Sequence, residues 1–169
     1  RVQAAASSAK LPVKHGSITV NLAPAYIKKE GSAYDLPILL ACVCACKGGA
    51  EALADKCFVG ELSLTGALRP VRGVLSMAIA AREKGFKEIY VPEENAPEAS
   101  AAGGIKVFGV KDAGQLYKHL FENPILKDSV FDVDSFNVSA MANQLDFADV
   151  KGQESAKKAL EIAVAGCHN

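Results

Sequence analysis

The sequence lacks a surplus of charge of either sign. Nineteen Lys and Arg residues balance nineteen Asp and Glu residues in a chain of 169, so net charge alone does not indicate a nucleic-acid partner. Long apolar runs are also missing, because the most obvious one, residues 36–46, is too short to span a bilayer. No secretory signal peptide is visible. These absences argue against a membrane-spanning or secreted protein and favour the cytoplasm.

Cysteines are present but few, and their number is odd. Such a count without an extracellular signal favours a reducing compartment. Only two of them share a helix face at i, i+4 spacing, and the histidines are scattered, so the ligands are too few for a metal site. We therefore interpret the cysteines as small buried apolar side chains and predict no metal site. The residues concerned are Cys42, Cys44, Cys46, Cys57, Cys167, His15, His119 and His168.

A phosphate-binding loop is missing as well. No G-x-x-x-x-G-K-[S/T] pattern occurs in the chain. The groups that cradle phosphates and hold Mg²⁺ are therefore absent, so we expect no cofactor to bind to this chain by itself. The chain begins without methionine, in a helical pattern, and stops within another. We expect it to be a fragment of a longer protein.

The most informative pattern that is present covers residues 57–95. Residues 58–64 alternate enough for a strand, Thr65-Gly66 is a turn dipeptide, and residues 67–71 return as a second strand. Residues 74–84 carry apolar side chains at helical spacing, and Gly85 is placed to end that helix. A further strand is predicted at residues 88–91.

The remaining elements alternate in the same way. Asp35 is a candidate N-cap for a helix at residues 36–46, and Asp112 for one at residues 113–121. The other predicted elements are helices at 1–8 and 96–102 and strands at 17–22 and 106–110. This order predicts an α/β (α+β) fold in which helices pack on a mixed sheet.

The last third of the chain differs in charge and pattern. Residues 122–169 hold four Lys and Arg against eight Asp and Glu. Residues 122–146 have no sustained period and are interpreted as an acidic linker, with contacts to the domain through Ile125, Leu126, Val130 and Phe131. Residues 147–169 begin a new unit, with a helix at 155–165.

Part of the central stretch matches a known family. The matching positions are GELSLTG at residues 60–66, Pro70, Gly73, Ala80, Ala81, Gly85, Pro92 and Asn95. They resemble the proteolytic domain of Lon proteases, which implies a Lon-like fold over residues 1–121. That family uses a Ser-Lys dyad, and the resemblance puts Ala33 at the nucleophile position and Leu75 at the lysine position. Ser32 lies one residue early.

The dyad chemistry is therefore not expected here. No lysine occurs between Cys57 and Glu83. Arginine does not deprotonate in proteins, so the three arginines of that stretch cannot replace it as a base. A serine without a base is a poor nucleophile. We interpret Ser32 as a loop or capping hydroxyl.

A second resemblance covers nearly the whole chain. The quoted segments are VNLAPA at residues 20–25, KEGS at 29–32, DLPI at 35–38, GELSL at 60–64, LRPVRGVL at 68–75, and VP with EN in residues 91–95. They resemble the magnesium-chelatase-related ATPases of the ComM/YifB competence-protein type. That family joins a Lon-like domain to an AAA+ module, so the resemblance implies that residues 147–169 open this module.

The resemblance also implies a function for the full-length protein. It would be a hexameric motor that uses ATP and Mg²⁺ and acts on DNA, as a helicase for branch migration in natural transformation. In AAA+ modules the backbone of the opening segment contacts adenine, which would assign that role to Val150, Lys151, Gly152 and Gln153.

Two other functions stay open at this point. One is the ATPase subunit of a magnesium chelatase, which would not need a Lon-like domain to load metal. The other is a Ser-Lys peptidase, which the missing lysine disfavours. Arg69 and Arg72 also have two interpretations: contact with DNA phosphates, helped by Lys28 and Lys29, or, for Arg72, an ion pair with Glu61 or Asp35 that holds the loop.

Overall fold

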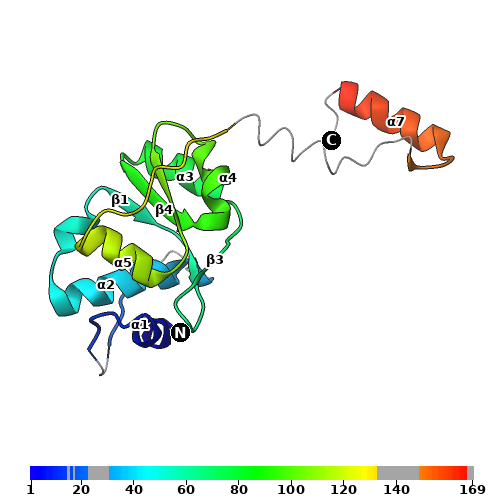
Figure 1. Cartoon of the computed structure of the whole chain (residues 1–169). Coiled ribbons are helices and arrows are strands. Elements are labelled where there is room, and N and C mark those ends of the chain that lie inside the picture. The colour runs from blue at the N-terminus through cyan, green and yellow to red at the C-terminus, as the bar shows by residue number, and fades with distance from the viewer. Residues whose placement is uncertain (15, 17, 23–30, 133–148, 167–169) are drawn as a thin grey trace. The chain divides into compact units, whose positions relative to one another are not determined.

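A parallel sheet organises the first part of the structure. The computed structural model describes residues 1–14, 16, 18–22, 31–132 and 149–166, and the chain divides into two compact units, Arg1–Phe131 and Asp132–Asn169 (Figure 1). In the first unit, β1 (Lys56–Phe58), β4 (Glu88–Pro92) and β5 (Lys106–Val110) form a three-stranded sheet in the order β1-β4-β5. All pairings in it are parallel, with Cys57 opposite Ile89 and Ile89 opposite Val107.

A small antiparallel hairpin makes the sheet content mixed. It joins β2 (Glu61–Leu62) to β3 (Leu68–Arg69), with Glu61 opposite Arg69. The turn between them uses Gly66 at φ 89°, a backbone angle that favours glycine. Helices lie in the connections between the parallel strands: α3 (Val74–Glu83) lies between β1 and β4, and α4 (Ala96–Ser100) lies between β4 and β5. The predicted α/β class with a mixed sheet is confirmed.

The two faces of the sheet are covered by different helices. Because successive side chains of a strand point to opposite faces, Ile89 and Val91 of β4 join the core under α3 and α4, while Tyr90 joins the core under α2 and α5. Figure 1 shows these two pairs of helices on opposite sides of β4. Tyr90 is stacked between Phe58 and Phe108, at centroid distances of 5.1 and 4.9 Å.

The long apolar helix of the N-terminal part is α2 (Asp35–Lys47), preceded by the 3-10 turn η1 (Ser32–Tyr34). Its core side chains include Leu36, Leu39 and Val43, all fully buried, and α1 (Val2–Ser8) packs beside it. The predicted N-cap at Asp35 is wrong. Tyr34 occupies that position, and the Asp35 carboxylate instead forms an ion pair with Arg1.

Two strand predictions also need correction. Residues 18–22 form no strand, and residue 17 lies outside the described residues. Alternation alone does not make a strand, which also needs a neighbour for its backbone hydrogen bonds. Ile18, Val20 and Leu22 instead lie beside α2, where they help to line a cavity of about 490 Å³. The strand predicted at 58–64 is broken at Val59 and Gly60, because β1 belongs to the parallel sheet and β2 to the hairpin.

The C-terminal elements of the first unit follow their predicted bounds. α5 (Ala113–Phe121) is capped by Asp112, whose carboxylate accepts the Gln115 N–H at 2.8 Å. The strand β5 begins and ends as predicted. Two 3-10 turns, η2 (Ala50–Leu53) and η3 (Glu93–Asn95), complete the described elements of this unit. The first unit runs to Phe131 and so includes residues 122–131 of the predicted linker.

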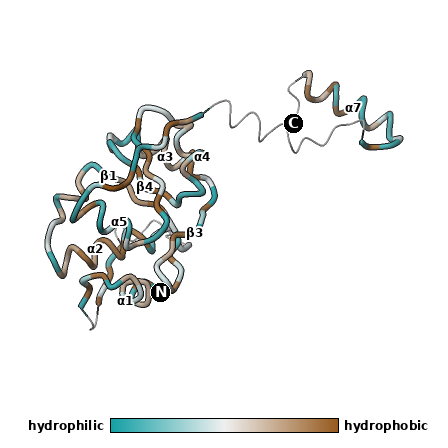
Figure 2. The backbone as a smooth tube through the Cα atoms, viewed as in Figure 1, coloured by the Kyte–Doolittle hydropathy of each residue, from teal (hydrophilic) through white to brown (hydrophobic). Residues whose placement is uncertain are grey.

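The second unit contains the helix α7 (Glu154–Ala165), one residue longer than predicted. Hydrophobic and hydrophilic residues are mixed along this helix (Figure 2), and Leu160, Ile162 and Val164 are exposed. Among the helices described, none combines the length and apolar character that crossing a membrane requires.

Candidate functional site

The loop at the predicted nucleophile position contacts other parts of the first unit through polar side chains. Gly31, at φ 97°, leads into the η1 turn, and Ser32 opens that turn. The Ser32 hydroxyl donates a hydrogen bond to Oε2 of Glu61 in β2. The other carboxylate oxygen of Glu61 accepts from Arg1 Nη1 at 3.0 Å, and the same guanidinium nitrogen lies 3.2 Å from Asp35 Oδ2. We call these four residues, Ser32, Glu61, Arg1 and Asp35, the Ser32 cluster.

The Ser32 cluster holds its members in place but does not resemble a catalytic dyad. A serine nucleophile needs a neighbouring base that takes its proton, such as an imidazole or a neutral amine. Glu61 is a carboxylate that is already paired with the guanidinium of Arg1, and it is neither an imidazole nor a neutral amine. The hydroxyl therefore links η1 to the hairpin, which agrees with the interpretation of Ser32 as a loop hydroxyl.

The other positions suggested by the Lon resemblance lie in defined elements. Ala33 is in the η1 turn next to Ser32. Leu75 is in the first turn of α3, and this residue is 36% exposed. Its backbone N–H donates to Glu98 Oε1 of α4 at 3.1 Å. The first turn of α3 is thus connected to α4 through Leu75, whereas Ser32 is connected to the hairpin.

The arginines of the hairpin are solvent-exposed. Arg69 lies opposite Glu61 in the hairpin register, and Arg72 follows β3 at an exposed position. The predicted ion pair of Arg72 with Glu61 or Asp35 is wrong, because Arg1 pairs with both carboxylates. Sequence spacing does not suggest Arg1, which is 60 residues from Glu61. Lys28 and Lys29 lie outside the described residues.

The segment assigned to adenine lies in the second unit. Val150, Lys151, Gly152 and Gln153 are all exposed and directly precede α7. Gln153 has a left-handed backbone at φ 61°, which is uncommon for a residue with a side chain. The backbone groups of these residues are thus at the start of a helix.

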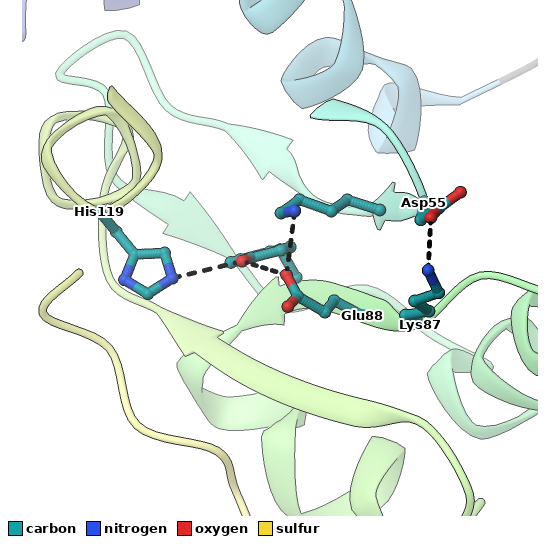
Figure 3. Close-up of polar contacts among 6 residues, drawn as sticks. Asp55, Lys87, Glu88 and His119 are labelled. Carbon is teal, nitrogen blue, oxygen red and sulfur yellow. Dashed lines mark hydrogen bonds and ion pairs between the residues drawn. The ribbon is translucent and has the colours of Figure 1, made fainter. Parts of the chain in front are cut away.

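A second polar cluster lies at the sheet, and sequence reasoning missed it. Tyr90 donates to Glu88 Oε2 at 2.8 Å, Lys56 Nζ is 3.4 Å from the same oxygen, and His119 Nε2 is 3.3 Å from the Tyr90 hydroxyl (Figure 3). We call these residues, Lys56, Glu88, Tyr90 and His119, the His119 chain. One signal was available: Glu88 and Tyr90 are two residues apart in a strand and so share a face.

Burial shifts the pKa values of Tyr90 and His119 in the His119 chain. It raises the pKa of Tyr90, and the hydrogen bond to Glu88 adds to that shift. It lowers the pKa of His119, against a smaller opposing effect of Glu88. The tyrosine hydroxyl is therefore a stable donor, and the imidazole is neutral at pH 7.

The described cysteines are all free thiols: Cys42, Cys44, Cys46 and Cys57. Cys42 is buried in the core and the other three are half-buried. Burial raises the pKa of Cys42, Cys44 and Cys57 and so favours the unreactive thiol over the thiolate. Within the part of the chain that the structure describes, no three potential ligands gather as a metal site would require. Cys167 lies outside it.

Comparison with known proteins gives matches at both ends of the chain. The family model for subunit ChlI of Mg-chelatase matches residues 1–95. The family model for magnesium chelatase, subunit ChlI, matches residues 146–169.

Three similar proteins cover different shares of the chain. Competence protein ComM of Haemophilus influenzae is 38% identical over 173 residues, which cover 100% of this chain and 33% of that protein. The uncharacterized protein YifB of Escherichia coli is 41% identical over 159 residues, 90% of this chain and 29% of that protein. A mitochondrial Lon protease homolog of Caenorhabditis elegans is 36% identical over 74 residues, 40% of this chain and 8% of that protein.

The chain spans about a third of the length of the curated relatives that it matches over its full extent. The family models match residues 1–95 of the first unit and the whole of α7, and the similarity to ComM covers 100% of the chain. The chain therefore belongs to the magnesium-chelatase-related family of the ComM and YifB type.

Proposed function

We propose that this chain is the non-catalytic Lon-like domain, with the start of the AAA+ module, of a cytoplasmic motor that acts on DNA. The full-length protein would hydrolyse ATP with Mg²⁺ as a hexamer and drive branch migration during natural transformation. The observation that carries the proposal is the similarity to competence protein ComM, which covers 100% of this chain. Residues 1–121 would form the Lon-like domain, 122–146 the linker and 147–169 the start of the ATPase.

The Ser32 cluster supports the non-catalytic part of the proposal. Ser32 donates to a carboxylate that is paired with Arg1, and Leu75 stands where the resemblance would need a lysine. A Lon-like domain without its dyad can still serve assembly or contact with DNA. In this proposal the domain retains the fold and the binding surface and has lost the peptidase reaction.

The exposed arginines support the contact with DNA. Arg72 is exposed, and the carboxylates that could have paired with it, Glu61 and Asp35, are occupied by Arg1. No ion pair of Arg72 is found within the described residues. A guanidinium in this position can bind a phosphate without first breaking an internal contact. Arg69, also exposed, would extend the same edge.

The start of the AAA+ module would supply only the base side of the nucleotide site. Val150, Lys151, Gly152 and Gln153 can offer backbone groups to adenine, but most nucleotide affinity comes from contacts to phosphates. The chain alone should therefore bind ATP too weakly for calorimetry at micromolar concentrations. Micromolar binding to this chain would contradict the assignment of residues 150–153.

The decisive experiment uses the full-length protein. We expect ATP hydrolysis that DNA stimulates, and ATP-dependent movement of a branched DNA junction. DNA affinity measured at two salt concentrations should fall steeply with ionic strength, and Arg72→Ala should reduce the slope of log K against log salt by about one. Lys84→Ala, which removes an exposed charge from the end of α3, is the matched control. It should change the slope of log K against log salt less than Arg72→Ala does.

Two results would contradict the proposal. One is ATP hydrolysis that is indifferent to DNA and leaves branched junctions unmoved. The other concerns the DNA surface only: unchanged affinity and salt dependence in Arg72→Ala with a lower melting temperature would assign Arg72 a structural role.

Metal insertion is a second candidate function. It is favoured by the family description, subunit ChlI of Mg-chelatase, which matches residues 1–95 and 146–169. In that case the full-length protein would support ATP-dependent insertion of Mg²⁺ into a porphyrin when mixed with the other chelatase subunits. Insertion activity without any effect of DNA would favour this candidate over the DNA motor.

A further inference from the structure

The segment of residues 123–131, which we call the strap, covers the edge of the parallel sheet. β5 is the last strand in the order β1-β4-β5, so its outer backbone groups need a partner. Asp128 forms an isolated antiparallel bridge with Phe108. The Ser129 N–H donates to the Val107 carbonyl at 2.7 Å, and the Val107 N–H donates to Asp128 Oδ1 at 2.9 Å. The strap is therefore fastened to β5 at one end by Asp128 and Ser129.

The other end of the strap is fastened by a histidine. Nδ1 of His119, on α5, accepts the backbone N–H groups of Ile125 and Leu126, both at 3.0 Å. An imidazole nitrogen can accept these bonds only when it carries no proton. The proton of the neutral ring must then be on Nε2, which faces the Tyr90 hydroxyl at 3.3 Å. Tyr90 in turn donates to Glu88, so the Nε2 proton of His119 and the Tyr90 hydroxyl proton each have an acceptor.

The surroundings of His119 keep its ring neutral. Its ring is packed at an angle to Tyr90 and Phe108, with centroids 5.7 and 5.4 Å away. The charged groups that act on it are Glu88 of β4, which favours the protonated ring, and Lys56 of β1, which disfavours it; burial outweighs both and lowers its pKa. On the strap itself, Lys127 and Asp128 are exposed, and Asp128 is engaged with Val107.

We propose that the strap is a proton-sensitive edge cover, which neutral His119 latches across β5. A proton that binds to Nδ1 turns this acceptor into a donor, and both strap N–H groups lose their partner at the same time. The end of the strap at residues 125 and 126 then separates from α5, while Asp128 and Ser129 hold the other end on β5. Because the second unit begins at Asp132, the strap is the last fastened segment of the first unit along the chain.

The latch can be tested by NMR on this 169-residue chain. The imidazole nitrogen shifts should show the proton of His119 on Nε2 at pH 7.5 and a titration midpoint below the ordinary value of 6.5. The protection factors of the Ile125 and Leu126 amides, corrected for intrinsic exchange, should fall about tenfold between pH 7.5 and pH 5.5. The Ser129 amide should fall less, since its acceptor does not titrate.

Two kinds of variant separate the latch from general acid effects. His119→Gln keeps an acceptor without a titrating group, so the protection of Ile125 and Leu126 should no longer depend on pH. His15→Gln and His168→Gln are matched controls that remove the other histidines and should leave the pH dependence unchanged. A proton found on Nδ1 of His119 at pH 7.5 would overturn the proposal. So would protection of the two amides that is constant across the titration of His119 in the unmodified chain, a result that needs no variant to fold.

Discussion

The Ser32 cluster and the His119 chain contain similar groups in different surroundings. Each joins a hydroxyl to a carboxylate that also has a cation nearby. The side chains of Arg1 and Glu61 are 44% and 30% exposed, whereas those of Lys56 and Glu88 are 24% and 23% exposed and Tyr90 is 1% exposed. Water weakens the first set of interactions, and burial strengthens the second and shifts its pKa values. The comparison teaches that two things make the His119 chain respond to protons: it contains an imidazole, which the Ser32 cluster lacks, and burial lowers the pKa of that imidazole.

The largest expected effect comes from removing the centre of the buried cluster. Tyr90→Ala should lower the free energy of unfolding by about 3–5 kcal/mol, because a fully buried ring between Phe58 and Phe108 is replaced by a cavity. Tyr90→Phe keeps the stack and removes only the hydroxyl, so it should cost about 1–2 kcal/mol. Urea unfolding followed by circular dichroism measures both. Equal losses in the two variants would show that the stack contributes little.

Acid should destabilise the domain through His119. The folded state lowers the pKa of this group, so its contribution is complete above the unfolded value of 6.5 and is lost as the pH falls toward the lower folded value. We expect a loss of about 1–2 kcal/mol, the magnitude of two backbone hydrogen bonds. Urea midpoints at pH 7.5 and pH 5.5 test it.

The matched comparison for acid is His119→Gln, which should remove most of that pH dependence. Asp55 has a pKa lowered by its hydrogen bond to Lys87 (Figure 3), but its contribution is lost only as the pH falls below its ordinary value of 3.8. An unfolding free energy that falls equally in both proteins between pH 7.5 and 5.5 would assign the loss to other groups.

The smallest effects are expected in the Ser32 cluster. Ser32→Ala removes one partly exposed hydrogen bond to Glu61 and should cost about 1 kcal/mol or less. Glu61→Gln retains an acceptor for the serine and weakens the pair with Arg1, which is worth roughly 0.5 kcal/mol at such exposure. Melting temperatures of the two variants are sufficient. Losses as large as that of Tyr90→Ala would mean that the Ser32 cluster is as well shielded from water as the His119 chain, which contradicts the difference drawn between them.

Local signals were sufficient for much of the fold. Asp112 before an apolar helical period predicted the start of α5, and Gly85 marked the end of α3, because caps and glycines act within one turn of chain. Residues 18–22 show where such signals fail. Their alternation describes a face that could be buried, but a strand also requires a partner strand that local sequence cannot supply.

The candidate site was less accessible to sequence reasoning. The family pattern located Ser32, Ala33 and Leu75, but it did not predict Arg1 as the partner of Glu61, since the two are 60 residues apart. The His119 chain was missed for the same reason, because His119 and Tyr90 are separated by 29 residues. Contacts of this kind depend on how helices cross the sheet, and no local spacing encodes that.

The central claim is that the Ser32 cluster holds a loop and carries no peptidase chemistry. The direct measurement incubates the chain with unfolded casein and, separately, with a serine-reactive phosphonate. Because Ser32 donates to a paired carboxylate and Leu75 occupies the position of the dyad lysine, we predict intact casein and an unlabelled serine. Cleavage of casein that disappears in Ser32→Ala would contradict the claim and restore the peptidase function.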